Sequence, residues 1–94
     1  MIILIKNQGQ IFKCVTKVES LVADVDWMIL DYLTPNKNYP PYYHVMLANS
    51  GIYRPIAVLS EEIFDKEVEN GNIILGKVKK IRYERFSNKK LNKV

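Results

Sequence analysis

The chain has 94 residues, of which 48% are hydrophobic and 26% are charged, and it carries a formal net charge of +4. This length and composition predict one globular domain, and they exclude a wholly disordered chain or a catalytic cleft between two lobes. A single cysteine and a single histidine exclude an internal disulfide and a Cys/His zinc cluster, so we expect no metal and no cofactor. Because Lys6 follows the short apolar opening MIILI, we expect no membrane-spanning segment and a cytoplasmic protein.

Two strands are predicted on either side of an early turn, NQGQ, in which Gly9 is free to adopt a positive φ. Residues 2–6 (IILIK) precede this turn and residues 11–18 (IFKCVTKV) follow it. In the second segment Phe12 and Cys14 fall on the same face and β-branched residues are frequent, which is typical of a half-buried strand.

A third strand-like run covers residues 21–30, where Asp24 and Asp26 are two positions apart and would project from one face of a strand. Two carboxylates alone are too few to predict a cation site. The segment that follows, residues 34–41 (TPNKNYPP), holds three of the four prolines and predicts a loop.

The clearest hairpin consists of YYHVMLA, the turn NSG and IYRPIAVL, and we expect it at the centre of a curved antiparallel sheet. Pro55 cannot donate a backbone hydrogen bond, which places the second strand at an edge or at a bulge. His44 lies on the first strand. No nucleophile in a recognisable local signature accompanies it, so we interpret His44 as a structural residue that bonds a backbone or carboxylate group, and we predict no enzyme.

After the hairpin, SEEIFDKEVENG predicts one short helical turn that Ser60 caps and Gly71 ends, with Ile63 and Phe64 directed to the core. The next segment, residues 73–86, matches both helical and strand spacing, and we favour a helix. The predicted domain therefore extends over residues 1–86, and residues 87–94 form a basic, frayed tail.

Basic residues are concentrated near the end of the chain: eight of the 14 Lys and Arg residues lie between Lys77 and Lys93, where Glu84 is the only acid. Acidic residues instead fill the middle of the sequence. Such a basic segment is typical of contact with nucleic acid or with an acidic protein surface, but it is equally typical of a solvated tail that keeps the protein soluble.

Four blocks of the sequence, GQIFK, VADVDW, NKNYPPYYHVML and AVLSEEIF, occur in the order and approximate spacing of a known family. In this respect the chain resembles the YccV-like family of hemimethylated-DNA-binding proteins, also called heat-shock protein HspQ. The resemblance covers residues 8–65. The chain departs from the family pattern at Trp27, where the family has proline, and at Ser20, near a family glycine, which suggests a remote relative.

The resemblance implies a mainly β fold, a small SH3-like curved sheet or barrel with one or two short helices. It also implies a non-enzymatic, cofactor-free binding module of the stress response, which binds DNA carrying methyl groups on one strand or acts as an adaptor of a Lon-type protease. The alternative is a protein-interaction module with no nucleic-acid role.

These two functions predict different contact residues. For phosphate contacts we expect a basic set near the chain end: Lys77, Lys79, Lys80, Arg82 and Arg85. For stacking or groove contact on DNA we expect exposed aromatic residues such as Trp27, Tyr39 and Tyr42. For a protein partner we expect an exposed apolar and aromatic surface around Trp27, Met28 and Tyr42.

Overall fold

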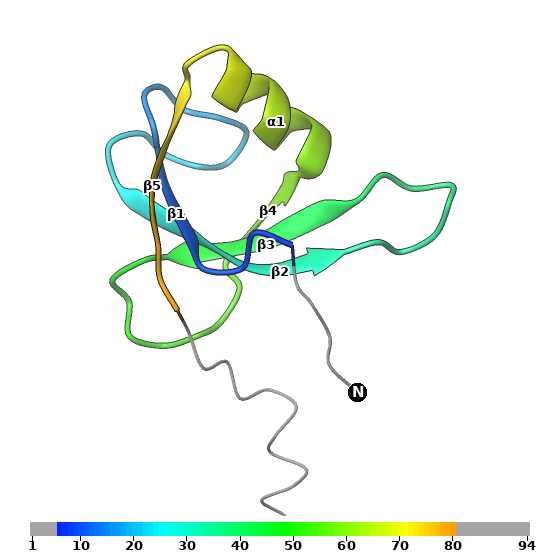
Figure 1. Ribbon diagram of the computed structural model, residues 1–94, viewed down its shortest axis with the longest axis horizontal. Coiled ribbons are helices and arrows are strands. Elements are labelled where there is room, and N and C mark those ends of the chain that lie inside the picture. Colours follow the sequence, from blue (N-terminus) through cyan, green and yellow to red (C-terminus); the bar gives the residue numbers. More distant parts are fainter. Residues whose placement is uncertain (1–5, 81–94) are drawn as a thin grey trace, which may run out of the picture.

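A computed structural model of the chain describes residues 6–80. Five strands and one helix follow each other along the chain: β1 (Gln10–Cys14), β2 (Asp26–Leu33), β3 (Tyr42–Leu47), β4 (Ala57–Ser60), α1 (Glu61–Glu69) and β5 (Ile73–Val78). All strand pairs are antiparallel and the order in the sheet is β4-β3-β2-β1-β5 (Figure 1). The prediction of a small, curled, mainly β domain is confirmed. No helix within the described residues is long and apolar enough to cross a membrane.

The central strand, β2, is buried on both faces. Trp27 and Ile29 belong to the main core, whereas Met28 and Leu30 belong to a second cluster on the opposite face. The pairing with β3 is irregular between Ile29 and Asp31, and beyond it Tyr32 packs against the main core three residues after Ile29. The continuous apolar run WMIL therefore reads as a strand with two covered faces, without the alternation of a half-exposed strand.

Helix α1 covers the main-core face of the sheet. Ser60 caps it, because its hydroxyl accepts hydrogen bonds from the backbone N–H groups of Glu62 and Ile63, and Gly71 follows its end with a φ of +83°. The ring of Phe64 packs edge-on against Phe12 and Tyr43, with centroid distances of 5.4 and 5.3 Å. The predicted cap and end are confirmed, although the helix is longer than the single turn that we expected.

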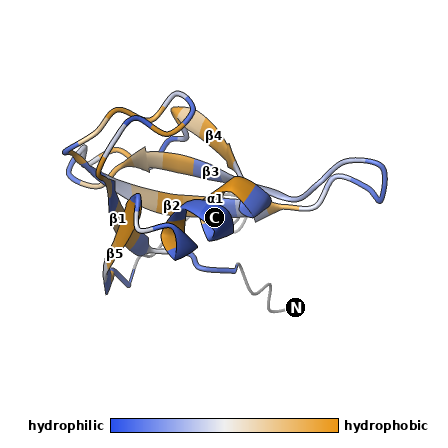
Figure 2. Ribbon diagram, turned by 90° about the horizontal axis from the view of Figure 1, so that it is seen from above, coloured by the Kyte–Doolittle hydropathy of each residue, from blue (hydrophilic) through white to orange (hydrophobic). Residues whose placement is uncertain are grey.

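Three of the predicted elements are wrong. Residues 73–78 form strand β5 and not a helix, because they pair along β1, where Ile73 lies opposite Cys14. The β3–β4 hairpin lies at one border of the sheet and not at its centre, and this border position of β4 agrees with the presence of Pro55 just before it (Figure 2). The run over residues 21–30 becomes a strand only at Asp26, since Asp24 adopts a left-handed φ of +66° that an extended strand excludes.

Several expectations lie outside the described residues. They are the strand predicted over residues 2–6, apart from Lys6, the continuation of the predicted domain from residue 81 to residue 86, and the tail at residues 87–94.

Gly9 joins the N-terminal turn to both the central strand and the end of β5. Its N–H donates to the Ile29 carbonyl at 2.8 Å, and its own carbonyl accepts from the Lys79 N–H at 2.8 Å. The φ of Gly9 is +86°, and a Cβ at this position would lie 2.0 Å from the Lys79 carbonyl oxygen. Only glycine therefore allows this three-way contact.

We expect Gly9→Ala to destabilise the fold by more than about 3 kcal/mol, because strain at a positive φ adds to a backbone clash that only a shift of β5 can relieve. Gly71→Ala is the matched control: Gly71 has a φ of +83°, but a Cβ there meets nothing within 4 Å. This control should cost only about 1–2 kcal/mol. Urea denaturation measures both values, and equal losses for the two variants would contradict the contact at Gly9.

Candidate functional site

A hollow of about 580 Å³ opens beside the end of β5. It lies on the face of the sheet opposite α1, since Ile11 and Ala48 in its wall belong to the second apolar cluster. We call it the basic hollow, and it is lined by Ile11, Asp26, Ala48, Asn49, Gly76, Lys77 and Lys79. The fold therefore brings two of the predicted phosphate-contact residues, Lys77 and Lys79, to one depression of the surface.

The lysines at the end of β5 lie at the surface of the described part of the chain. Within residues 6–80, no carboxylate forms an ion pair with Lys77, Lys79 or Lys80, and all three residues are exposed. The ammonium of Lys79 lies 5.7 Å from the centroid of the Tyr53 ring, a cation–π contact that restrains the side chain without neutralising it. Arg82 and Arg85, the other predicted members of the set, lie outside the described residues.

The one carboxylate of the hollow, Asp26, is shared with a further lysine. Lys13 Nζ lies 3.9 Å from Asp26 Oδ1, and both side chains are about half exposed. Asp26 therefore offsets Lys13 more directly than it offsets Lys77 or Lys79. The balance of charge around the hollow is positive, which favours an anionic ligand.

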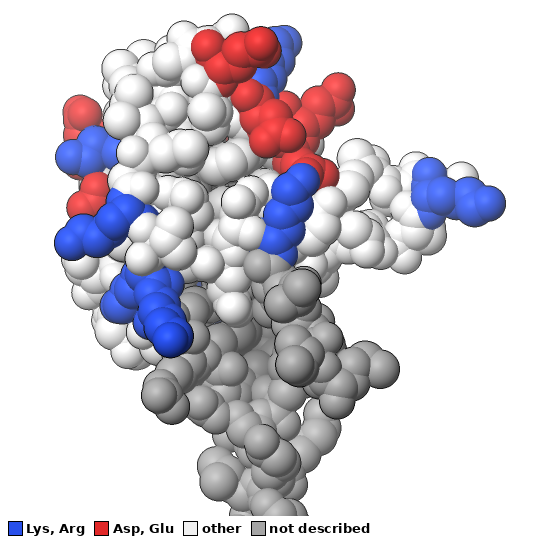
Figure 3. All heavy atoms as spheres, viewed as in Figure 1, with Lys and Arg blue, Asp and Glu red and all other residues white. Residues whose placement is uncertain are grey.

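Negative charge gathers instead over α1, which carries five acidic residues: Glu61, Glu62, Asp65, Glu67 and Glu69. Figure 3 shows the acidic side chains clustered over the helix and basic side chains beside the end of β5. The described part of the molecule is thus electrically polar, as the sequence indicated. The acidic helix therefore repels an anion, whereas the lysines of the basic hollow attract it.

The exposed surface predicted around Trp27 and Met28 does not exist. Trp27 is only 5% exposed and its indole N–H donates to the Val22 carbonyl at 3.1 Å, while Met28 is fully buried in the second cluster. Tyr42 is half-buried and packs against the ring of His44, with the centroids 5.7 Å apart. Burial of the central strand on both faces removes Trp27 and Met28 from any contact with a partner. Tyr39, in contrast, is 64% exposed on the loop of residues 34–41.

A different apolar surface is exposed around the β3–β4 connection, and the sequence reasoning missed it. We call it the 47–58 patch after the segment that carries it, and its members are Leu47, Ile52 and Ile56, which are 38%, 66% and 56% exposed. A shallow depression of about 150 Å³ lies among Leu47, Ile52 and Ile56, beside Arg54. The strand pattern had assigned Ile52 and Ile56 to a hairpin strand, but only residues 57–60 pair with β3. The available signal was Pro55, which interrupts the predicted strand between Ile52 and Ile56.

His44 pairs with a carboxylate, as predicted for a structural role. Its Nδ1 lies 3.1 Å from Oδ2 of Asp31, which is only 6% exposed. No nucleophile completes a catalytic set in the described part of the chain. The Ser60 hydroxyl caps α1, and burial raises the pKa of the Cys14 thiol, which keeps this side chain protonated and unreactive. Within residues 6–80, no group of three or more His, Cys, Asp or Glu residues could hold a metal ion.

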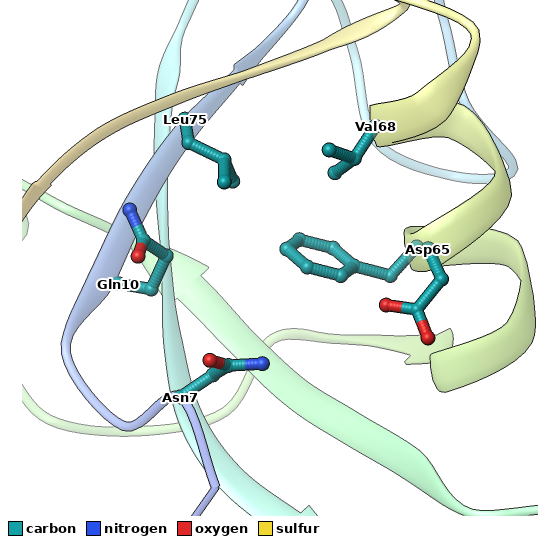
Figure 4. A pocket seen from close by; sticks show the side chains of 6 residues that line it. Asn7, Gln10, Asp65, Val68 and Leu75 are labelled. Atoms are coloured by element: carbon teal, nitrogen blue, oxygen red, sulfur yellow. The ribbon is translucent and has the colours of Figure 1, made fainter.

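A smaller hollow, of about 240 Å³, lies between α1 and the sheet (Figure 4). Phe64, Val68 and Leu75 form its apolar wall, and Asn7 and Gln10 lie at its polar end. Both side-chain amides already make hydrogen bonds within the protein: Asn7 Nδ2 donates to the Tyr43 hydroxyl at 2.9 Å, and Gln10 Nε2 donates to the Gly76 carbonyl at 2.8 Å. This hollow therefore offers a ligand little beyond apolar contact.

Compared with known protein families, with curated proteins and with solved structures, the chain gives no match.

His44→Gln should cost about 1 kcal/mol of stability and leave ligand binding unchanged, because glutamine can still donate a hydrogen bond to Asp31. His44→Leu should cost about 1–3 kcal/mol more, since it removes one hydrogen-bond partner of a buried carboxylate. Thermal denaturation and a binding assay on both variants test this role. Loss of binding at unchanged stability would make His44 a contact residue.

Glu61 makes the stability of α1 depend on pH. Its carboxylate accepts hydrogen bonds from the Lys6 ammonium and from the Tyr32 hydroxyl, and the contact with Lys6 holds the pKa of Glu61 below its usual value of 4.5. A carboxyl group whose pKa is lowered by folding stabilises the native state above its unfolded pKa, and this stabilisation is lost as the pH falls through the folded pKa. We therefore expect part of the stability to disappear below about pH 4.5.

Glu61→Gln should abolish that part of the acid-induced loss, while the exposed neighbour Glu62→Gln should retain it. Urea titrations at pH 7 and pH 3 give the two differences. An equal dependence on pH in both variants would show that the Glu61 contacts do not contribute.

Proposed function

We propose that this chain is a small, non-enzymatic binding module that binds DNA through the basic hollow. The observation that carries the proposal is the convergence of Lys77 and Lys79, which have no carboxylate partner within the described residues, on one surface depression of about 580 Å³. The resemblance of residues 8–65 to the hemimethylated-DNA-binding family supports the same ligand.

The chemistry of the hollow suits phosphate better than a base edge. Lysine ammonium groups act as point charges that neutralise phosphates and release counterions, and Asn49 adds a side-chain amide that can donate a hydrogen bond to a phosphate oxygen. Phosphate contacts position a protein on a duplex but carry no information about sequence. A preference for hemimethylated DNA would need further contacts, and Tyr39 and Lys37 on the exposed loop of residues 34–41 are available for them.

A second candidate function is that of an adaptor for a Lon-type protease, and the 47–58 patch favours it. A cluster of exposed aliphatic side chains around one arginine is typical of a protein contact, since apolar and Arg residues are enriched in interface cores. This candidate replaces the predicted surface around Trp27 and Met28, which is buried.

The dependence of affinity on salt tests DNA binding. The logarithm of the affinity for a duplex should fall linearly with the logarithm of salt concentration, with a slope of about −0.9 per phosphate contacted. Replacing Lys77 and Lys79 with alanine should make the slope shallower by about 2 and weaken binding to all sequences alike. Fluorescence anisotropy with a labelled duplex measures both quantities.

Lys17→Ala combined with Lys66→Ala is the matched control: it removes the same charge from two residues that do not line the hollow. If the control variant changes the slope as much as the hollow variant does, binding depends on net charge alone and the proposed site is wrong. If duplex binding is absent while Ile52→Asp and Ile56→Asp abolish binding to a Lon-type protease, the adaptor function replaces it.

A further inference from the structure

Strand β5 forms one border of the sheet, and its outer edge faces no other strand within residues 6–80 (Figure 2). Its inner edge is paired with β1, and at its two ends the Asn72 carbonyl and the Lys79 N–H are directed to Val15 and Gly9. Natural border strands carry charges, prolines, bulges or a cover that limit pairing with other chains. The second half of β5 has two of these features, Lys77 and an irregularity in its pairing with β1 between Leu75 and Val78, whereas the first half has neither. Residues 73–76 (IILG) have no charge and no proline, and Ile74, Leu75 and Val78 are 54%, 47% and 63% exposed.

We propose that the β5 edge pairs with β5 of a second copy of this chain. The two strands would run antiparallel about a two-fold axis at Leu75, before the irregularity, so that Leu75 of one copy lies opposite Leu75 of the other. Such pairing joins the two five-stranded sheets into one continuous sheet and satisfies the open backbone groups of both strands.

The distribution of charge along β5 favours a second copy over an unrelated strand. The strand is acidic before its start, where α1 ends with Glu67 and Glu69, and basic after its end, at Lys79 and Lys80. Antiparallel pairing places the basic end of each copy alongside the turn at Gly71 and Asn72 of the other, close to the acidic end of its helix. Opposite charges thus meet twice, once on each side of the axis, while apolar residues meet at the centre.

Side-chain size at the centre is also complementary. With the axis at Leu75, Ile74 of one copy lies opposite Gly76 of the other, so that next to the axis a large residue meets a residue without a side chain. A two-fold axis perpendicular to the sheet keeps both helices on one face and both basic hollows on the opposite face. Dimerisation is therefore compatible with DNA binding through Lys77, but it does not depend on it.

Sedimentation equilibrium of the full chain tests the proposal directly. We expect a mass of two chains that falls to one on dilution, and Ile74→Lys should raise the dimer dissociation constant by more than about tenfold, because it brings charge to an apolar border. Ile52→Lys is the matched control: it adds the same charge at a residue that is 66% exposed but lies in the 47–58 patch, and it should leave the dissociation constant unchanged.

A cysteine at position 75 tests the geometry of the pairing. Opposite residues of antiparallel strands have Cα atoms about 4.5–5.5 Å apart, which is within the range of a disulfide. Leu75→Cys should therefore give a covalent dimer under mild oxidation, and Ile52→Cys should not; the native Cys14 is fully buried and can stay in both variants. A chain that remains monomeric at several hundred µM, or equal effects at positions 74 and 52, would overturn the proposal. Failure of DNA binding leaves the measured mass unaffected, so the two hypotheses are tested separately.

Discussion

Gly9 fixes the position of everything at the basic end of the molecule. Its N–H donates a hydrogen bond to the Ile29 carbonyl of the central strand, and its carbonyl accepts one from the Lys79 N–H at the end of β5. The approach is so close that a methyl group at Gly9 would meet the Lys79 carbonyl oxygen. The direction in which Lys77 and Lys79 leave the sheet therefore depends on a glycine that is distant in sequence and does not line the basic hollow.

The strand that Gly9 contacts explains why the rest of the domain has its present surface. Because β2 is buried on both faces, its aromatic and sulfur-containing residues build two apolar clusters and leave none of their area to a partner. The surfaces that remain accessible are therefore peripheral: the basic hollow at one end of the sheet, the 47–58 patch, and the border strands. This is the usual consequence of a short chain, which needs most of its large apolar residues for its own stability.

Sequence patterns correctly predicted the features that depend only on residues close together in the chain. The Ser60 cap, the left-handed Gly71 and the strand alternation of Tyr43 and Val45 arise from residues near in sequence, and the structure confirms them. The prediction for residues 73–78 was wrong because Ile74 and Val78 fit both periods, and only pairing with β1, some 60 residues earlier in the sequence, decides between them.

The sequence also predicted only the local part of the candidate site. Charge clustering identified Lys77 and Lys79, but it could not show that Asn49 and Asp26 complete a hollow with them, since these residues meet only when three strands assemble. Trp27 was misassigned because a tryptophan next to acidic residues looks the same in sequence whether it faces a partner or the core. Its burial follows from the pairing of Trp27 with Phe12 of β1 and Leu47 of β3, which no local pattern contains.

The separation of charge between the two faces of the sheet has a consequence for binding geometry. Acidic residues cover α1 on one face, and the lysines of the hollow lie towards the other, so a polyanion is attracted to one side of the domain and repelled from the opposite side. The electrostatic field of the domain therefore orients an approaching polyanion towards the face of the hollow before any hydrogen bond forms. A sheet extended through β5 would preserve this polarity, because a two-fold axis perpendicular to the sheet does not exchange its faces. Both basic hollows would then lie on the same face of the joined sheet, so that a duplex bound at one hollow would meet the second in an intramolecular step and the number of phosphate contacts would be doubled.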